Sequence, residues 1–306
     1  MHEIDKVAIN FDEGQLFLLN LCLTFLMFGI ALDLNFKDFK YVFQRPKSVI
    51  IGLTSQLVLL PFLTLLIIFL WQPPASIQLG MLMVAVCPGG NVSNYFVHRS
   101  NGNTALSISL TSIVTFTAVI LTPLSFVLFS RILGASIEQT VGLSVDLASM
   151  IWLFCQLVLL PLVLGMLINY YLPKLRDLIV KPARWFSILL LIGIIVFALG
   201  SNVYVLQHHL QTVFLLVLIH NSLALLTGYY FSKLNSLSLS DTKAVTIETG
   251  IQNSGLGLIL IFNYFDGLGG MAVVAAWWGV WHLISGLAIS TYWAKTSAPP
   301  ISAPTG

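Results

Sequence analysis

Charged side chains are scarce in this chain of 306 residues, because lysine, arginine, aspartate and glutamate together make up only 8% of it. Hydrophobic residues make up 57%, and the mean hydropathy is +0.92. A water-soluble domain of this composition has too few polar side chains to cover its surface. The scarcity of charge therefore excludes a soluble fold and indicates a polytopic membrane protein embedded in a lipid bilayer. It also leaves no basic patch for a nucleic acid.

Cysteine is rare as well, and all three cysteines, Cys22, Cys87 and Cys155, fall inside apolar runs. We expect them to be small buried hydrophobic residues rather than a disulfide or a metal set. The hydrolase motifs HExxH and GxSxG are missing from the sequence, and only one acid lies deep in an apolar run. We therefore expect no enzyme. We also expect no cleavable signal peptide, and no obligate protein partner is evident.

Long apolar runs fill most of the chain and predict an all-α fold. A helix needs about 20 apolar residues to cross the hydrocarbon layer, whereas a closed barrel needs shorter alternating strands. The runs predict nine transmembrane helices at residues 14–34, 47–71, 76–98, 103–131, 143–170, 185–206, 210–232, 242–263 and 269–293. Residues 296–306 are polar and proline-containing, so we expect a disordered tail.

The distribution of basic residues predicts the orientation in a cell inner (plasma) membrane. The connections after the first, third, fifth and seventh runs and the C-terminal end hold twelve of the fourteen basic residues. By the positive-inside rule this side is cytoplasmic. Residues 1–13 are then extracellular or periplasmic, the C-terminus is cytoplasmic, and the number of spans is odd. The twelve residues are Lys37, Lys40, Arg45, Lys47, Arg99, Lys174, Arg176, Lys181, Arg184, Lys233, Lys243 and Lys295.

Two of the nine runs are interrupted by glycine and polar residues. The third run contains CPGGNVSN at residues 87–94, and the eighth contains IETGIQNSG at residues 247–255. With the fifth run set aside, the first four and the last four form halves of opposite orientation, and each half is interrupted in its third run. Interruptions at matching places in inverted repeats point to a transporter binding site near the bilayer midplane. Unwound backbone at that depth is tolerated beside a cavity or a ligand.

The interruptions carry the chemistry of a site for a monovalent cation. Glu248 is the only carboxylate that the predicted spans place well inside the apolar layer, so a proton, a base or a cation must neutralise it. Oxygen donors without sulfur or clustered imidazole suit an alkali or alkaline-earth ion, and a single carboxylate favours a monovalent one. The donors near Glu248 in these runs are Gln252, Asn253, Ser254, Ser93, Asn94 and Gln56, with Ser107, Thr111 and Thr115 on one face of the fourth run.

These motifs, together with WHLISG at residues 281–286, resemble those of the bile acid:sodium symporter family, in particular bacterial members of its nine-helix form. The resemblance runs from about residue 20 to about residue 294 and implies two sodium sites that share Glu248. The first uses the side chains of Ser93, Asn94, Ser107, Thr111 and Glu248. The second uses Glu248, Gln56, Gln252 and the backbone carbonyls around Thr249 and Ile251.

The resemblance also implies how the helices are grouped. The two interrupted helices cross within a core domain formed by residues 47–131 and 210–293. A panel domain is formed by residues 14–34, 143–170 and 185–206. The substrate lies between the two domains.

Two departures from the family pattern bear on the substrate. Leu283 replaces an asparagine that is common in members that carry bile acids, and Asn91 replaces a smaller residue. The exposed N–H groups of the half-helices favour a carboxylate, so we expect a small organic anion or an amino-acid-like zwitterion. The residues expected at the substrate are Asn91, Asn253, Ser254 and His282. His220 is either a second substrate contact or a hydrogen-bonding partner between helices.

Several alternatives stay open at this point. A proton can replace sodium as the coupling ion at Glu248, and a bile acid can be the substrate. A channel fits inverted interrupted helices around a lone carboxylate less well than alternating access does, and a sensor without net transport is a further class. Sodium-dependent uptake at fixed pH separates sodium coupling from proton coupling.

Overall fold

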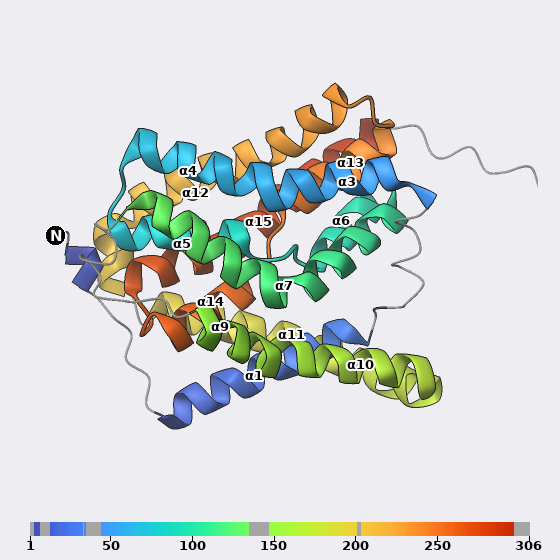
Figure 1. The fold of residues 1–306 in the computed structure, drawn as a ribbon, viewed down its shortest axis with the longest axis horizontal. Coiled ribbons are helices and arrows are strands. Elements are labelled where there is room, and N and C mark those ends of the chain that lie inside the picture. The colour runs from blue at the N-terminus through green and yellow to red at the C-terminus, as the bar shows by residue number, and fades with distance from the viewer. Residues whose placement is uncertain are drawn as a thin grey trace, which may run out of the picture.

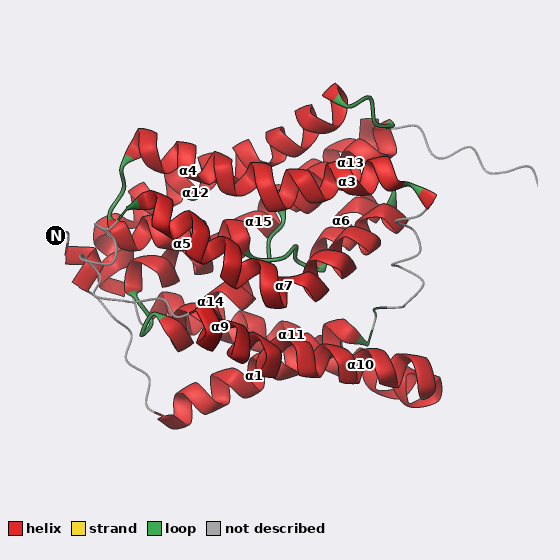
Figure 2. Ribbon diagram, viewed as in Figure 1, coloured by secondary structure: helices red, strands yellow, loops and turns green. Residues whose placement is uncertain are grey.

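The computed structural model describes residues 3–6, 13–32, 34, 44–134, 147–200 and 203–296. Throughout these ranges the secondary structure is helical, with short connections (Figure 2). The expected all-α fold is therefore confirmed. Most of the N-terminal segment 1–13 and the tail beyond Thr296 lie outside the described residues, so the predictions for them stay predictions.

Each predicted span overlaps a helix or a pair of helices in series. A short 3-10 helix η1 (Glu3–Lys6) comes before α1. The helices are α1 (Glu13–Ala31), α3 (Pro46–Thr54), α4 (Leu60–Trp71), α5 (Ala75–Val86), α6 (Val92–Arg99), α7 (Thr104–Leu133), α9 (Leu147–Phe154), α10 (Leu160–Tyr171), α11 (Pro173–Gly200), α12 (Val203–Leu234), α13 (Leu239–Gly250), α14 (Ser254–Tyr264) and α15 (Gly269–Thr296).

Five helical stretches among the described residues are long and apolar enough to cross a membrane by themselves: Pro46–Trp71, Thr104–Leu133, Leu147–Tyr171, Val213–Leu234 and Gly269–Thr296. Shorter apolar helices lie at Asn20–Ala31, Ala75–Val86 and Ser254–Tyr264. The last two are halves of the interrupted runs, which explains their length. The count of nine spans stays a prediction.

The structure corrects the placement of several basic residues. Lys174, Arg176 and Lys181 lie inside α11, which begins well before residue 185 because Pro173 starts it and a proline suits the first helical position. Lys243 lies inside α13 with only 2% of its surface exposed. Its ammonium donates to the carbonyl of Ser100, which follows α6, at 2.6 Å.

Two helices contain a wide π-helical turn directly before a proline. Ser55–Leu59 joins α3 to α4, and Cys155–Leu159 joins α9 to α10. In each case the residue after the wide turn donates its N–H to a carbonyl five residues back. Pro61 and Pro161 lack an N–H and crowd the carbonyl four residues earlier, so widening the turn relieves the clash. The first of these turns carries Gln56 into the interior.

The helices form two groups in space. Figure 1 shows α1, α9, α10 and α11 in a layer along one side of the molecule, with the other helices above them. Within this layer, α1 packs along both α10 and α11. These are the helices predicted to form the panel domain, and the division into domains stays a prediction.

A reciprocal pair of amides joins the layer to the helices above it. Asn20 on α1 donates to Asn263 on α14 at 3.0 Å, and Asn263 donates back to Asn20 at 2.7 Å. Each amide thus uses one donor and its acceptor on the other. Interhelical hydrogen bonds of this kind help to hold helices together in a membrane.

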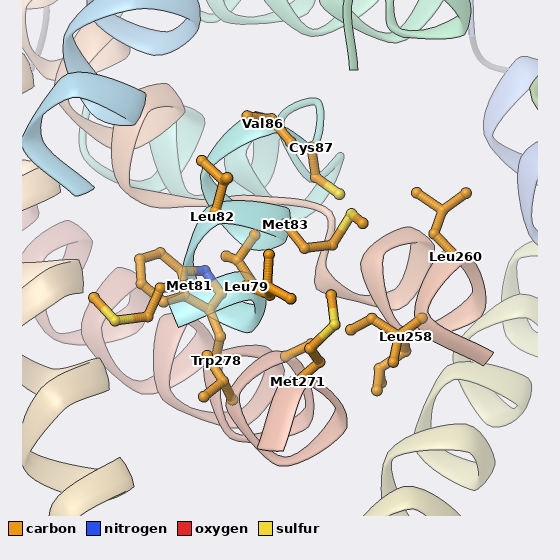
Figure 3. Packing of buried hydrophobic residues seen from close by; sticks show 14 of the residues in the cluster. Leu79, Met81, Leu82, Met83, Val86, Cys87, Leu258, Leu260, Met271 and Trp278 are labelled. Atoms are coloured by element: carbon orange, nitrogen blue, oxygen red, sulfur yellow. The ribbon is translucent and has the colours of Figure 1, made fainter. Parts of the chain in front are cut away.

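The part of the largest hydrophobic core drawn in Figure 3 lies where α5, α14 and α15 meet. Its side chains include Leu79, Met83 and Leu258, with Trp278 fully buried at the α15 side. Gly80 lets α5 and α15 approach closely, since a Cβ there would lie 2.8 Å from the Cα of Met271. This core holds α5 and α14, one half of each interrupted helix, in a single cluster and so helps to fix the interruptions relative to each other.

The start of α13 is held by a second carboxylate. Asp241 accepts from the hydroxyl of Ser48 at 2.7 Å and from the amide of Asn103 at 2.6 Å. Ser48 belongs to α3, and Asn103 caps the N-terminus of α7. The helix that carries Glu248 is therefore tied to two neighbours more than two turns before the interruption.

Candidate ion-binding site

The two interruptions pair with each other through their backbones. Gly90 donates its N–H to the carbonyl of Ile251 at 3.0 Å, and Asn253 donates to the carbonyl of Pro88 at 2.8 Å. Gly89 and Gln252 thereby form an isolated antiparallel bridge. Segments about 160 residues apart in sequence thus satisfy each other's unwound backbone, which a buried chain requires.

Glu248 lies beside this bridge with 1% of its surface exposed, and hydroxyl groups surround its carboxylate. Ser93 and Ser107 both donate to Oε1, the latter at 2.5 Å. Thr111 lies 2.9 Å from Oε2 and 3.1 Å from Oε1. Among the described residues, no basic side chain forms an ion pair with this carboxylate. The charge is therefore surrounded by neutral oxygen atoms.

Asn94 adds an amide oxygen to the same cluster. Its Oδ1 lies 2.7 Å from the hydroxyl of Ser107 and 3.5 Å from that of Thr111. Ser107 has a single hydroxyl proton, so it cannot donate to Asn94 and to Glu248 at the same time. Oxygen acceptors thus outnumber protons in this cluster, and the excess lone pairs are what a hard cation coordinates. The structure brings together all five residues of the predicted first sodium site.

A second group of predicted ligands lies close to Gly89. Gln56 donates to Gln252 at 3.3 Å, and Gln252 donates to the carbonyl of Thr249 at 2.9 Å. The Oε1 of Gln56 is buried and has no partner among the described residues. A Cβ at Gly89 would lie 2.9 Å from Gln56 Nε2, 3.0 Å from Glu248 Oε2 and 3.7 Å from the carbonyl oxygen of Ile251. The side chain of Gln56 and the carboxylate of Glu248 therefore both lie against Gly89.

The predicted substrate residues are less closely associated. Asn253 caps α14 by accepting from the N–H of Leu256 at 3.1 Å, and Asn91 occupies the corresponding position before α6 but its side chain does not cap that helix. Ser254 is buried at the start of α14. His282 is buried on α15, and among the described residues no hydrogen bond joins its side chain to the other three. Their role stays a prediction.

His220 forms a contact between helices. Its Nε2 lies 2.8 Å from the hydroxyl of Thr64 on α4, and its ring centroid lies 4.8 Å from that of Trp278 on α15. Thr64 donates its proton to the carbonyl of Leu60 at 2.8 Å, so its oxygen accepts from the histidine. Of the two interpretations of His220, the structure supports the interhelical hydrogen bond.

Two residues near the second interruption were missed by the sequence analysis. Ser55 lies 2.8 Å from the hydroxyl of Thr249, and Asn221 donates to the carbonyl of Gly250 at 2.7 Å. Asn221 directly follows His220 in an apolar run, and a polar residue at that depth is a usable signal. Ser55 gives no such signal, because serine is common between packed membrane helices.

The fold and this site define the class of protein: an all-helical membrane protein with a carboxylate buried among neutral oxygens where two interrupted helices meet. The model of the sodium bile acid symporter family matches residues 20–209. The chain belongs to the sodium bile acid symporter family. Its members are transporters and not enzymes, so the chain is a sodium-dependent transporter of the multi-pass membrane type.

Relatives from bacteria, plants and animals share the likeness. The uncharacterized sodium-dependent transporter YocS of Bacillus subtilis is 33% identical over 270 residues, which cover 88% of this chain and 81% of the relative. The probable sodium/metabolite cotransporter BASS2 of rice, a chloroplast protein, is 29% identical over 95% of this chain and 67% of its own length. The human P3 protein is 29% identical over 82% of this chain and 52% of its own length.

Proposed function

We propose that this protein is a symporter that couples the inward movement of sodium to that of a small organic anion or amino-acid-like carboxylate. The observation that carries the proposal is the buried carboxylate of Glu248, which three hydroxyl groups and the Asn94 amide oxygen surround in place of a basic side chain. An ionised carboxylate is costly at this depth unless a cation joins it. One carboxylate with neutral oxygens matches a monovalent hard ion.

Two ions share Glu248 in this proposal. The first is held by oxygens of Ser93, Asn94, Ser107, Thr111 and Glu248. The second is held by Gln56, Gln252, Glu248 and the carbonyls of Thr249 and Ile251. The unpartnered Oε1 of Gln56 supports the second site, because a buried acceptor without a donor is costly unless a ligand satisfies it.

The substrate binds next to the ions, near Asn91, Asn253, Ser254 and His282. Helices α6 and α14 both begin at the interruptions, and the N–H groups and helix dipoles at their N-termini favour a carboxylate. The names of relatives support a metabolite as the substrate class, since one is described as a sodium/metabolite cotransporter. Ions and substrate then meet at the same unwound segments, which provides a physical basis for coupling.

Transport proceeds by alternating access in a plasma membrane. The proposed unit has nine spans in inverted repeats, with the two interrupted helices crossing inside the core domain and the panel domain moving relative to it. The N-terminus is outside and the C-terminus is in the cytoplasm. A label before Gly14 should then react from outside and one after Ala294 from inside, and both ends on one side would contradict the odd number of spans.

Uptake by proteoliposomes tests the coupling. Radiolabelled small carboxylates and amino acids are supplied with an inward sodium gradient or an equal potassium gradient, at the same pH on both sides and with a protonophore present. We expect accumulation only with sodium. In a second arm, without sodium and without the protonophore, uptake driven by an inward proton gradient would assign the coupling to a proton at Glu248 instead.

A further inference from the structure

The carbonyl groups at the end of α13 lose their helical partners because the helix stops at Gly250. Each of three successive carbonyls finds a different donor. Thr249 accepts from the side chain of Gln252 at 2.9 Å, and Ile251 accepts from the N–H of Gly90 at 3.0 Å. The carbonyl between them, that of Gly250, accepts from the amide of Asn221 at 2.7 Å. Among these donors, Asn221 alone comes from α12, outside both interrupted helices.

Asn221 is fully buried, and α12 packs closely along α13 at this point. Gly228 on the same helix leaves no room for a Cβ, which would lie 2.8 Å from the Cα of Thr246. Leu225 packs equally tightly on Gly250. The spacing of Asn221, Leu225 and Gly228 puts them on one face of α12. The amide is therefore held firmly against the interruption.

The Oδ1 of Asn221 has no partner among the described residues, although it is buried. A buried amide with an unpaired acceptor costs free energy that a leucine of the same size does not. Its donor is used on the interruption, and its oxygen is a neutral acceptor beside it. This is the chemistry that suits a cation or a water bound to it.

The bond to Gly250 has a geometric consequence. A peptide unit is planar, so fixing the carbonyl of Gly250 fixes the whole unit that joins it to Ile251. The carbonyls of Thr249 and Ile251 belong to the two adjoining peptide units, whose directions depend on the φ and ψ torsions of Gly250 and Ile251 at either end of the fixed unit. Glycine has the greatest conformational freedom of any residue type, so a third hydrogen bond, to the carbonyl of Gly250 itself, limits torsional motion that the separate bonds to the carbonyls of Thr249 and Ile251 do not remove.

We infer that Asn221 is a positioning residue for the second sodium site, which it serves by holding the carbonyls of Thr249 and Ile251 toward the ion. This inference rests on the proposed sodium-coupled function. It assigns to α12 a role in ion binding that neither interrupted helix can provide.

The test measures thermal unfolding of the detergent-solubilised full chain as NaCl replaces KCl at constant ionic strength. For Asn221→Leu we expect the sodium concentration of half-maximal stabilisation to rise about tenfold, which corresponds to about 1.4 kcal/mol. We also expect the steepness of the sodium dependence to fall toward that of a single ion. A purely structural role would lower the unfolding temperature equally in both salts and leave the midpoint and steepness unchanged.

Asn235→Leu is the matched control. The Asn235 amide makes the same kind of bond, to the carbonyl of Phe231 at 2.8 Å, but just after the end of α12 and away from the interruption. This variant should keep the wild-type sodium midpoint. Asn221→Ser, which keeps a hydroxyl donor in a smaller side chain, should fold and show an intermediate shift.

The possible outcomes distinguish a failure of the proposed function from a failure of the role of Asn221. A wild-type chain that sodium does not stabilise contradicts the proposed function. A wild-type chain that responds to sodium, together with Asn221→Leu and Asn221→Ser variants of unchanged midpoint and steepness, contradicts the role of Asn221 alone. Should Asn221→Leu fail to fold, unchanged sodium dependence in Asn221→Ser and Asn221→Ala overturns the inference.

Discussion

Both interruptions leave unwound backbone inside the protein, but they differ in the residues that they contain. The first, between α5 and α6, contains Pro88, Gly89 and Gly90, and no side chain caps the helix that follows it. The second, between α13 and α14, contains Gln252 and the capping residue Asn253. Each supplies the backbone hydrogen bonds that the other lacks.

The first interruption provides space, and the second provides ligands. The two glycines matter because they have no Cβ. Gln56, Glu248 and the backbone of Gln252 all approach them closer than a Cβ normally allows. The second interruption contributes the carboxylate, an amide and several carbonyls. A binding site at crossed segments therefore needs one segment with little side-chain volume so that the other can bring its ligands close. The predictions below test this division, in order of expected effect.

Removing the carboxylate should have the largest effect. We expect Glu248→Ala to abolish stabilisation by sodium, because both proposed ions lose their only charged ligand. The measurement is thermal unfolding in NaCl against KCl. Asp241→Ala is the control, since Asp241 is also a buried carboxylate with hydroxyl and amide donors but lies at the start of α13. It should lower stability equally in both salts, and a normal sodium response in Glu248→Ala would refute the shared site.

Filling the space beside the glycines of the first interruption should have the second largest effect. The double variant Gly89→Ala, Gly90→Ala places one Cβ 2.9 Å from Gln56 Nε2 and another 3.3 Å from the carbonyl oxygen of Gln252. It should insert into the membrane and extract as a folded protein, yet bind sodium poorly and lose uptake. Gly193→Ala, where a Cβ meets nothing within 4 Å, is the matched control. Uptake at the wild-type rate would mean that the first interruption is only a kink.

Removing one neutral oxygen should have an intermediate effect. We expect Ser107→Ala or Thr111→Ala to raise the half-maximal sodium concentration about tenfold, because a hydrogen bond to a charged group contributes about 1.5 kcal/mol or more. Ser112→Ala on the same helix serves as control, since its hydroxyl bonds the helix's own carbonyl at Ile108. Identical sodium titrations for Thr111→Ala and Ser112→Ala would remove α7 from the site.

Removing the cap of α14 should have the smallest effect. Asn253→Ala loses the bond to the N–H of Leu256, which costs about 1 kcal/mol. The unfolding temperature should fall by the same amount in sodium and in potassium, and Asn253→Ser should restore most of it, because serine also caps helices well. A loss confined to sodium would show that Asn253 acts on the ions and not only on the helix.

Much of the first ion cluster could be predicted from the sequence because polar residues of this kind are unusual inside apolar runs. Glu248 is an acid in an apolar run, and Ser107 and Thr111 repeat at helical spacing. The family resemblance then joined segments far apart in the chain. The contacts among these residues confirm that they lie together, while their binding of sodium stays a prediction.

What the sequence could not indicate depends on packing between helices. The bond from Asn221 to Gly250 arises from the close approach of α12 and α13, and no local pattern encodes a distance between two helices. The burial of Lys243 could not be predicted for the same reason, since it depends on the carbonyl of Ser100 that accepts from its ammonium group. The long start of α11 was missed because its first turns are too polar to be recognised as part of an apolar run.

The amide pair between Asn20 and Asn263 has a consequence for the electrical behaviour of transport. If the layer that contains α1 separates from α14 in each cycle, these two hydrogen bonds break and re-form. Amides carry no net charge, so the membrane voltage does no work on this contact, whereas one elementary charge crossing 100 mV exchanges about 2.3 kcal/mol. The membrane potential would then act on the charged groups of the proposed transport cycle and not on the breaking of this amide pair.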